Sequence, residues 1–71
     1  MINKYTYRLN TPVFNEYGHI IIIRYEYDYT FGQYLYDWQF DMQFDKDIQR
    51  LKNEISDEDW LKVQQIVFDI L

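Results

Sequence analysis

The chain has 71 residues, a net charge of −5 and no cysteine. A chain of this length forms one domain whose single core leaves about 3–5 kcal/mol of net stability. The absence of cysteine excludes disulfides, thiolate metal sites and cysteine nucleophiles. The negative charge repels phosphate backbones and anionic membranes, so we expect no direct nucleic-acid binding and no membrane binding.

The sequence carries no recognisable targeting or membrane segment. Residues 1–5 lack the apolar stretch of a signal peptide, and the longest aliphatic run, residues 20–23, is too short to cross a bilayer. We therefore expect a cytoplasmic protein.

Alternating large residues predict a first β-strand at Tyr5, Tyr7, Leu9, Thr11 and Val13. Pro12 lacks an N–H donor, which favours an edge position for this strand. A turn follows in which Gly18 takes a positive φ, so that Asn15 faces His19. In this register Val13 meets Ile21, and Tyr5 meets Tyr29.

The same period of two predicts two further strands. Their apolar sets are Ile21, Ile23, Tyr25, Tyr27 and Tyr29, and then Tyr34, Tyr36, Trp38, Phe40, Met42 and Phe44. The segment Thr30-Phe31-Gly32-Gln33 predicts a tight hairpin with Thr30 opposite Gln33. This register pairs Tyr25 with Trp38 and Ile23 with Phe40, and it places both apolar sets on one face.

After Phe44 the spacing changes to three and four, which predicts helices. Asp45 is the expected N-cap of the first helix, whose apolar face is Ile48, Leu51 and Ile55, and Ser56 is the expected N-cap of the second. The second helix carries an apolar stripe of Trp60, Val63, Ile66 or Val67, and Ile70. The predicted fold is α+β with one domain over residues 1–71: a three-stranded antiparallel β-meander followed by two C-terminal α-helices packed on one face.

One end of the predicted sheet is rich in tyrosine and extends past the helices. The strands are expected to reach about 36 Å and the helices about 16 and 24 Å. The tyrosines at that end are Tyr5, Tyr7, Tyr27, Tyr29, Tyr34 and Tyr36. Exposed tyrosines are typical interface anchors. The alternative is that they pack on Trp60, on Phe68 and on one another.

The opposite face of the predicted sheet is acidic. The register places Glu26 opposite Asp37, with Asp28 and Asp41 nearby, and a rigid array of carboxylates imitates a phosphate backbone. Asp37 and Asp41 are expected about 13 Å apart, or roughly two phosphate intervals. The alternative is a solvated face that keeps the protein soluble and prevents edge pairing. Leu35 on the same face favours a docking patch.

No motif for catalysis or cofactor binding is present. His19 is the single histidine and lies in the predicted turn, and the carboxylates lack the spacing of a calcium loop. Phosphate loops, nucleophile elbows and dinucleotide fingerprints are absent. We therefore expect no catalytic residue, no metal, no cofactor and no enzyme activity.

The function favoured by the sequence is a small acidic binding protein, an inhibitor that docks on a basic groove of a larger nucleic-acid-processing protein. Analogy with short acidic proteins of phages and mobile elements extends this to a DNA mimic with an anti-defence role. The expected contacts are acidic (Glu26, Asp28, Asp37 and Asp41) and aromatic or apolar (Tyr27, Tyr29, Tyr34, Tyr36 and Leu35). The alternative is a self-associating structural or accessory protein, a homodimer through the tyrosine-rich face or the edge strand.

Overall fold

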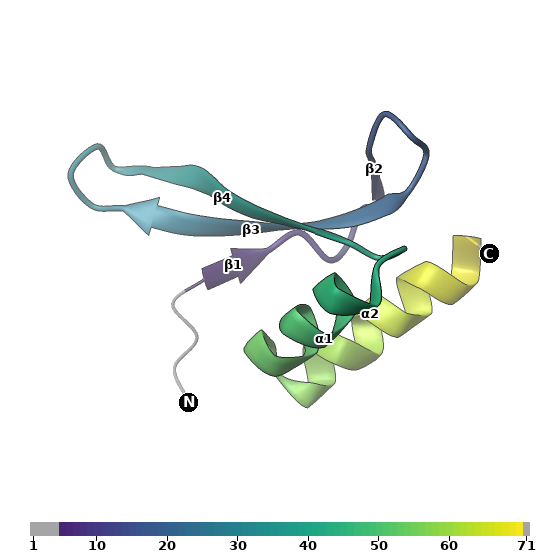
Figure 1. The fold of residues 1–71 in the computed structure, drawn as a ribbon. Helices are drawn as coiled ribbons and strands as arrows, with labels where there is room; N and C mark the ends of the chain where they lie inside the picture. The colour runs from purple at the N-terminus through teal and green to yellow at the C-terminus, as the bar shows by residue number, and fades with distance from the viewer. Residues whose placement is uncertain (1–4, 71) are drawn as a thin grey trace.

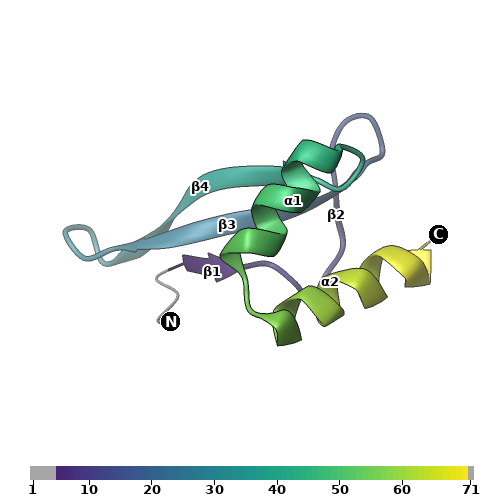
Figure 2. The ribbon, with the colours of Figure 1, turned by 60° about the horizontal axis from the view of Figure 1, so that its bottom comes forward.

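The computed structural model describes residues 5–70, except for the side chains of residues 69 and 70. The elements in chain order are β1 (Tyr5–Tyr7), β2 (Val13–Phe14), β3 (Ile20–Asp28), β4 (Gln33–Asp41), α1 (Asp45–Glu54) and α2 (Asp57–Ile70). All strand pairs are antiparallel, and β3 lies between β4 on one edge and both β1 and β2 on the other. The two helices cover one face of the sheet (Figures 1 and 2). The predicted α+β class is confirmed.

The predicted first strand is interrupted in the middle. Val13 pairs with Ile21 as predicted, but Tyr7 pairs with Arg24, so residues 8–12 oppose only residues 22 and 23 of β3. Tyr5 consequently faces Glu26 and not Tyr29. Pro12 lies in this interruption, where its missing N–H costs no ladder hydrogen bond.

The turn between β2 and β3 forms as predicted. The Asn15 N–H donates to the His19 carbonyl at 3.0 Å, and Gly18 has a φ of 79°. The Asn15 side chain also accepts from the backbone N–H groups of Tyr17 and His19, at 3.0 and 2.9 Å. An amide that satisfies two backbone donors stabilises a turn locally.

The β3–β4 hairpin is wider than predicted. Asp28 pairs with Gln33, so the loop holds residues 29–32. The Asp28 carboxylate accepts from the Thr30 N–H at 2.8 Å, and the Gly32 N–H donates to the Asp28 carbonyl at 2.8 Å. Gly32 has the predicted positive φ, 64°. An aspartate that caps its own turn favours this loop over the two-residue turn expected between Thr30 and Gln33.

A β-bulge at Asp37 divides β4 into two registers. Arg24 pairs with Trp38, whereas the next residue, Tyr25, pairs with Tyr36, which leaves Asp37 as the extra residue. Because successive side chains alternate between faces, an extra residue moves Trp38 and Tyr36 to opposite faces. The predicted pairing of Tyr25 with Trp38, and a single face for the whole apolar set, are therefore wrong.

The core lies between the helices and the half of the sheet beyond the bulge. Phe40 faces Ile22, and not Ile23 as predicted. Both are fully buried against Leu51, Ile55 and Val63, and each large apolar side chain buried in this way contributes about 1.5–3 kcal/mol. The partly buried residues around them are Tyr7, Leu9, Met42, Trp60 and Val67.

The helices begin close to the predicted residues. Phe44 and not Asp45 is the N-cap of α1, so Asp45 and Asp47 lie in the first turn, where carboxylates complement the helix dipole. Ser56 caps α2 as predicted, since its hydroxyl accepts from the Asp59 N–H at 3.2 Å. The predicted role of the Ile70 side chain lies outside the described residues.

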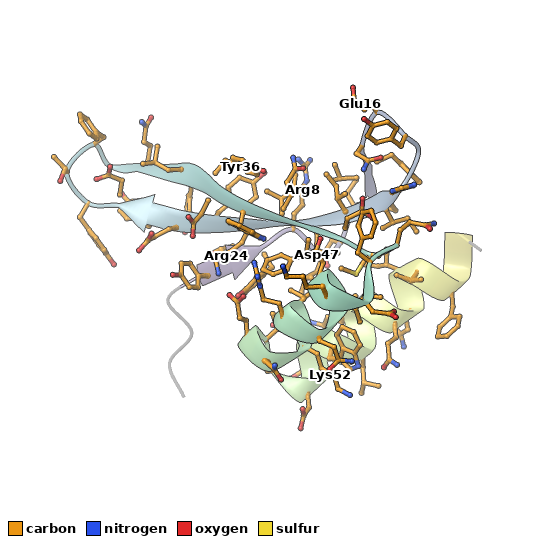
Figure 3. The ribbon with its side chains drawn as sticks, in the orientation of Figure 1. Arg8, Glu16, Arg24, Tyr36, Asp47 and Lys52 are labelled. Atoms are coloured by element: carbon orange, nitrogen blue, oxygen red, sulfur yellow. The ribbon has the colours of Figure 1, made fainter. Side chains whose placement is uncertain are left out.

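Arg24 joins the sheet to α1 at the end of the core. Its guanidinium lies 2.9 Å from a carboxylate oxygen of Asp37, donates to Glu54 of α1, and sits 4.1 Å from the ring centroid of Tyr5 (Figure 3). Burial alone would lower the pKa of Arg24, but the carboxylates of Glu54 and Asp37 outweigh it and raise the pKa above its ordinary value. The cation therefore stays charged although its side chain is only 15% exposed.

Asp41 forms a second polar cluster at the other end of β4. Its carboxylate accepts from the Gln43 N–H at 2.9 Å and from Asn15 Nδ2 at 3.0 Å, and lies 2.9 Å from His19 Nδ1. The Asp41 N–H donates to Asp47 of α1 at 3.0 Å. Burial alone would raise the pKa of Asp41, but Gln43, His19 and Asn15 together hold it below its ordinary value.

Replacing Arg24 by methionine should destabilise the fold by about 2–3 kcal/mol, because two facing carboxylates lose their shared cation. Urea unfolding followed by circular dichroism measures the change. The matched control is Arg50→Met, which removes an exposed arginine 5.2 Å from the Trp38 ring and should cost about 1 kcal/mol or less. Equal losses for the two variants would contradict the role given to Arg24.

Replacing Asp41 by asparagine should lower the free energy of unfolding by about 1–3 kcal/mol at pH 6. A carboxylate whose folded pKa is lowered stabilises the fold above its unfolded pKa of about 3.9, and that contribution disappears as pH falls through the folded pKa. The difference between wild type and Asp41→Asn should therefore shrink below about pH 4. Urea unfolding at several pH values, with Glu16→Gln as the control, tests this; a difference that widens in acid would contradict it.

Candidate functional site

The hairpin half of β3 and β4, residues 25–37, extends past the helices as an arm (Figures 1 and 2). β1 pairs with the base of this arm at Tyr25 and Glu26, and the remainder has two strands. The arm contains three carboxylates, Glu26, Asp28 and Asp37, and neither lysine nor arginine. Its aromatic residues are Tyr25, Tyr27, Tyr29, Phe31, Tyr34 and Tyr36. The sequence thus concentrates negative charge and aromatic area in the part of the sheet that the helices leave uncovered.

The carboxylates of the arm lie on the face that continues from the core. Arg24 points toward α1, where it pairs with Glu54 (Figure 3). The ion pair of Asp37 with Arg24 places Asp37 on the same side. Glu26, two residues along β3, shares that face and pairs with Leu35. The predicted opposition of Glu26 and Asp37 is wrong, and this acidic face lies on the helix side of the sheet, not on the side away from it.

The tyrosines of the arm occupy the opposite face. Tyr25 pairs with Tyr36 and Tyr27 with Tyr34, and Tyr36 projects away from the helices (Figure 3). The Tyr27 ring meets that of Tyr34 edge to face at a centroid distance of 5.0 Å, and that of Tyr29 at 4.9 Å. We therefore find these rings packed on one another, while their position on this face separates them from Trp60 and Phe68 of α2.

The predicted exposure of the tyrosine end is confirmed for three of its six tyrosines. Tyr36 is 55% exposed, Tyr34 59% and Tyr29 89%, whereas Tyr27 is half-buried. Tyr5 and Tyr7 differ, because they face the helix side: Tyr5 stacks under Arg24, and the Tyr7 hydroxyl donates to Glu54 at 3.4 Å. The exposed tyrosines among these six thus all belong to the arm.

An open hollow of about 420 Å³ lies on the arm. Its lining is Glu26, Tyr27, Asp28, Tyr29, Thr30, Leu35, Tyr36 and Asp37. Seven of the nine predicted contact residues are in this lining, and an eighth, Tyr34, packs on one of them. The structure brings these eight together in one part of the surface.

Asp41 is the predicted contact residue that lies elsewhere. It pairs with Ile21, next to Ile22 of the core face, so its side chain is on the face away from the helices, with Asn15 and His19. Asp37 is on the helix side, where it pairs with Arg24. The predicted row of Asp37 and Asp41 on a single face is therefore wrong, because the bulge lies between them.

The three carboxylates of the hollow have different surroundings. Asp28 holds the turn through the Thr30 N–H, and Asp37 pairs with Arg24, so both are fixed in place by the fold. Glu26 is exposed in the middle of β3. Among the side chains of residues 5–68, no three His, Asp or Glu gather closely enough to hold a metal ion. The three carboxylates give this part of the arm an acidic surface.

Sequence reasoning missed two residues next to this surface. Trp38 is 44% exposed beside the bulge, and Thr30 joins the lining through the wide loop. The signal for Thr30 was Asp28 two positions earlier, which is the spacing of an aspartate-capped turn. Trp38 was expected in the core because its neighbours in the alternating pattern are apolar.

Among the described residues, no helix is long and apolar enough to cross a membrane.

Comparisons of the chain with protein-family models, with curated proteins and with solved structures give no match.

Proposed function

We propose that this protein is a small non-enzymatic binding protein whose arm docks in a basic groove of a larger protein. The observation that carries the proposal is the arm itself, which has three carboxylates, no cation and a set of exposed aromatic rings beyond the helices. Positive grooves attract such a surface over several ångströms, and aromatic anchors supply contact area once the surfaces meet.

The two faces of the arm suit different parts of a groove. Glu26, Asp28 and Asp37 offer acceptors to lysine and arginine side chains. Tyr34 and Tyr36, on the other face, present ring area with hydroxyls that remain able to bond to polar groups. A thin arm with contacts on both faces fits between two walls better than against a flat surface.

Grooves of this charge occur in proteins that process nucleic acids, because they bind phosphates. Occupation by the arm would exclude the nucleic acid, so the proposed activity is inhibition by competition. The DNA mimic with an anti-defence role and a phage or mobile-element origin is the specific form of this proposal, and it rests on analogy. Three carboxylates support it in place of the predicted four, since Asp41 lies outside the arm, beside His19 and Asn15.

Reversing a single charge on the arm should weaken capture of the partner about tenfold or more, because a contact between opposite charges becomes repulsive. The variant is Glu26→Lys, and the measurement is affinity capture from a lysate of the source organism, quantified by mass spectrometry. A genuine partner is retained by wild type, lost with Glu26→Lys, and released by 0.5 M salt or by excess duplex DNA.

The matched control is Glu16→Lys, which changes the net charge equally in the exposed turn between β2 and β3 (Figure 3). Capture should survive this change. Partners lost equally with both variants would show that only total charge matters, and a partner that Glu26→Lys still binds would contradict docking through the arm.

A second candidate function is self-association through the tyrosine face of the arm. The exposure of Tyr34 and Tyr36 on one face favours it. In that case light scattering should show a dimer at micromolar concentration that resists salt, and replacing Tyr29 and Tyr34 by serine should dissociate it. A monomer at all accessible concentrations would rule this candidate out.

A further inference from the structure

The outer edge of β4 has no strand neighbour among the described residues, since β4 pairs with β3 alone. Seven of its nine residues are exposed. Natural proteins protect such an edge with lysine, proline or a short strand. The sequence of β4 contains neither lysine nor proline. The strand carries the bulge at Asp37, and α1 contacts it through Asp47 at the Asp41 N–H and through Arg50 at the Trp38 ring.

The hydrogen bonds between β3 and the end of β4 show which backbone groups of β4 face outward near the core. The Met42 N–H donates to the Ile20 carbonyl, so Met42 and the residues two and four positions before it direct their backbone groups to β3. Gln39 and Asp41 therefore direct theirs away. The Asp41 N–H is taken by Asp47, whereas Gln39 lies next to it along the same open edge.

The backbone N–H and C=O groups of the arm alternate in direction in the same way. The Arg8 N–H donates to the Ile23 carbonyl, so the backbone groups of Ile23 and Tyr25 face β1, and those of Glu26 face β4. Leu35, the partner of Glu26, then faces β3. Tyr34 and Tyr36 consequently point their N–H and C=O groups outward, in line with Gln39.

Large apolar side chains project from both faces of β4 in and next to the arm. Tyr34 and Tyr36 are 59% and 55% exposed on one face, and Leu35 and Trp38 are each 44% exposed on the other. Large apolar residues on both faces of a strand are usual where both faces are covered by other parts of a protein. At this part of β4 both faces are open, so an added strand would have apolar side chains to contact on each of them.

We infer that an extended, lysine- or arginine-bearing segment of the partner adds to β4 as a further strand, hydrogen-bonded to Tyr34, Tyr36 and Gln39. This rests on the proposed function and states how the partner is held. Strand addition gains affinity from the backbone and specificity from alternate side chains. A basic segment would lie next to Asp37 of β4, with Glu26 and Asp28 of β3 one strand farther away, whereas a second copy of the chain would bring two acidic arms together.

The test uses a nine-residue peptide of alternating arginine and valine, the length of β4, with a glutamate–valine peptide of the same length as control. Binding is followed by two-dimensional NMR and amide hydrogen exchange. We expect the arginine peptide alone to bind, and the exchange of the Tyr34, Tyr36 and Gln39 amides to slow about tenfold or more in its presence. Equal binding of the two peptides, or unchanged exchange at these amides, would overturn the inference.

A pair of variants tests the backbone contact directly. Gln39→Pro removes one outward N–H at an edge position that tolerates proline, and Gln39→Ala removes only the side chain. Gln39→Pro should weaken the arginine peptide about three- to tenfold, the factor expected for one lost hydrogen bond, and Gln39→Ala should not. If the Gln39→Pro variant does not fold, the amide exchange of the wild-type protein with the arginine peptide decides whether a strand is added. Equal affinity of two folded variants would overturn the inference.

Experiments with the natural partner distinguish strand addition from docking of the arm in general. A captured protein that depends on Glu26 but leaves the Tyr34 and Tyr36 amides in fast exchange would support docking and reject strand addition. Slow exchange at these amides in the free protein, together with a dimer in light scattering, would assign the edge to a second copy and overturn the inference.

Discussion

The bulge at Asp37, where Asp37 forms an ion pair with Arg24, determines how the rest of the sheet is arranged. A guanidinium at the end of the core needs carboxylates, and it finds Glu54 on α1 and Asp37 on β4. Asp37 reaches it from the helix side only because β4 has an extra residue at that point. Past the bulge, the tyrosines face away from the helices and the carboxylates continue along the core face. The chemical character of both faces of the arm therefore depends on this bulge, at which the partly buried Arg24 pairs with Asp37.

The sequence predicted the elements well and the register poorly, for a physical reason. Alternation identifies strands, and Gly18 and Ser56 mark a turn and a helix start by local geometry, so these features were confirmed. A bulge leaves no trace in the pattern when large apolar residues occupy every even position from 34 to 44. Arg24 was counted with the polar set, although its side chain reaches the core through partners distant in sequence.

The candidate surface, too, was predicted correctly in which residues it contains, apart from Asp41, and incorrectly in which face they occupy. Residues close together on the hairpin, such as Glu26, Leu35 and Tyr36, are brought together by any nearby register, so the structure places them in one hollow. Asp41 lies on the predicted face, away from the helices, but the bulge leaves Asp37 and Glu26 on the other, and the contacts of Asp41 with His19 and Asn15 form only in the folded sheet. Spacing along one strand carries no information about such cross-strand partners, or about which face a strand presents after an irregularity.

The order of elements along the chain has a consequence for synthesis. All four strands precede both helices, so the ribosome releases a complete hairpin before the residues that cover it. Until Leu51 and Val63 emerge, Ile22 and Phe40 can pack only on each other and on preceding residues such as Tyr7 and Leu9, and the Asp41 end of β4 lacks Asp47. An uncovered sheet with an open edge is the species most prone to aggregate. The docking of α1 and α2 therefore ends the period in which the nascent hairpin is exposed to aggregation.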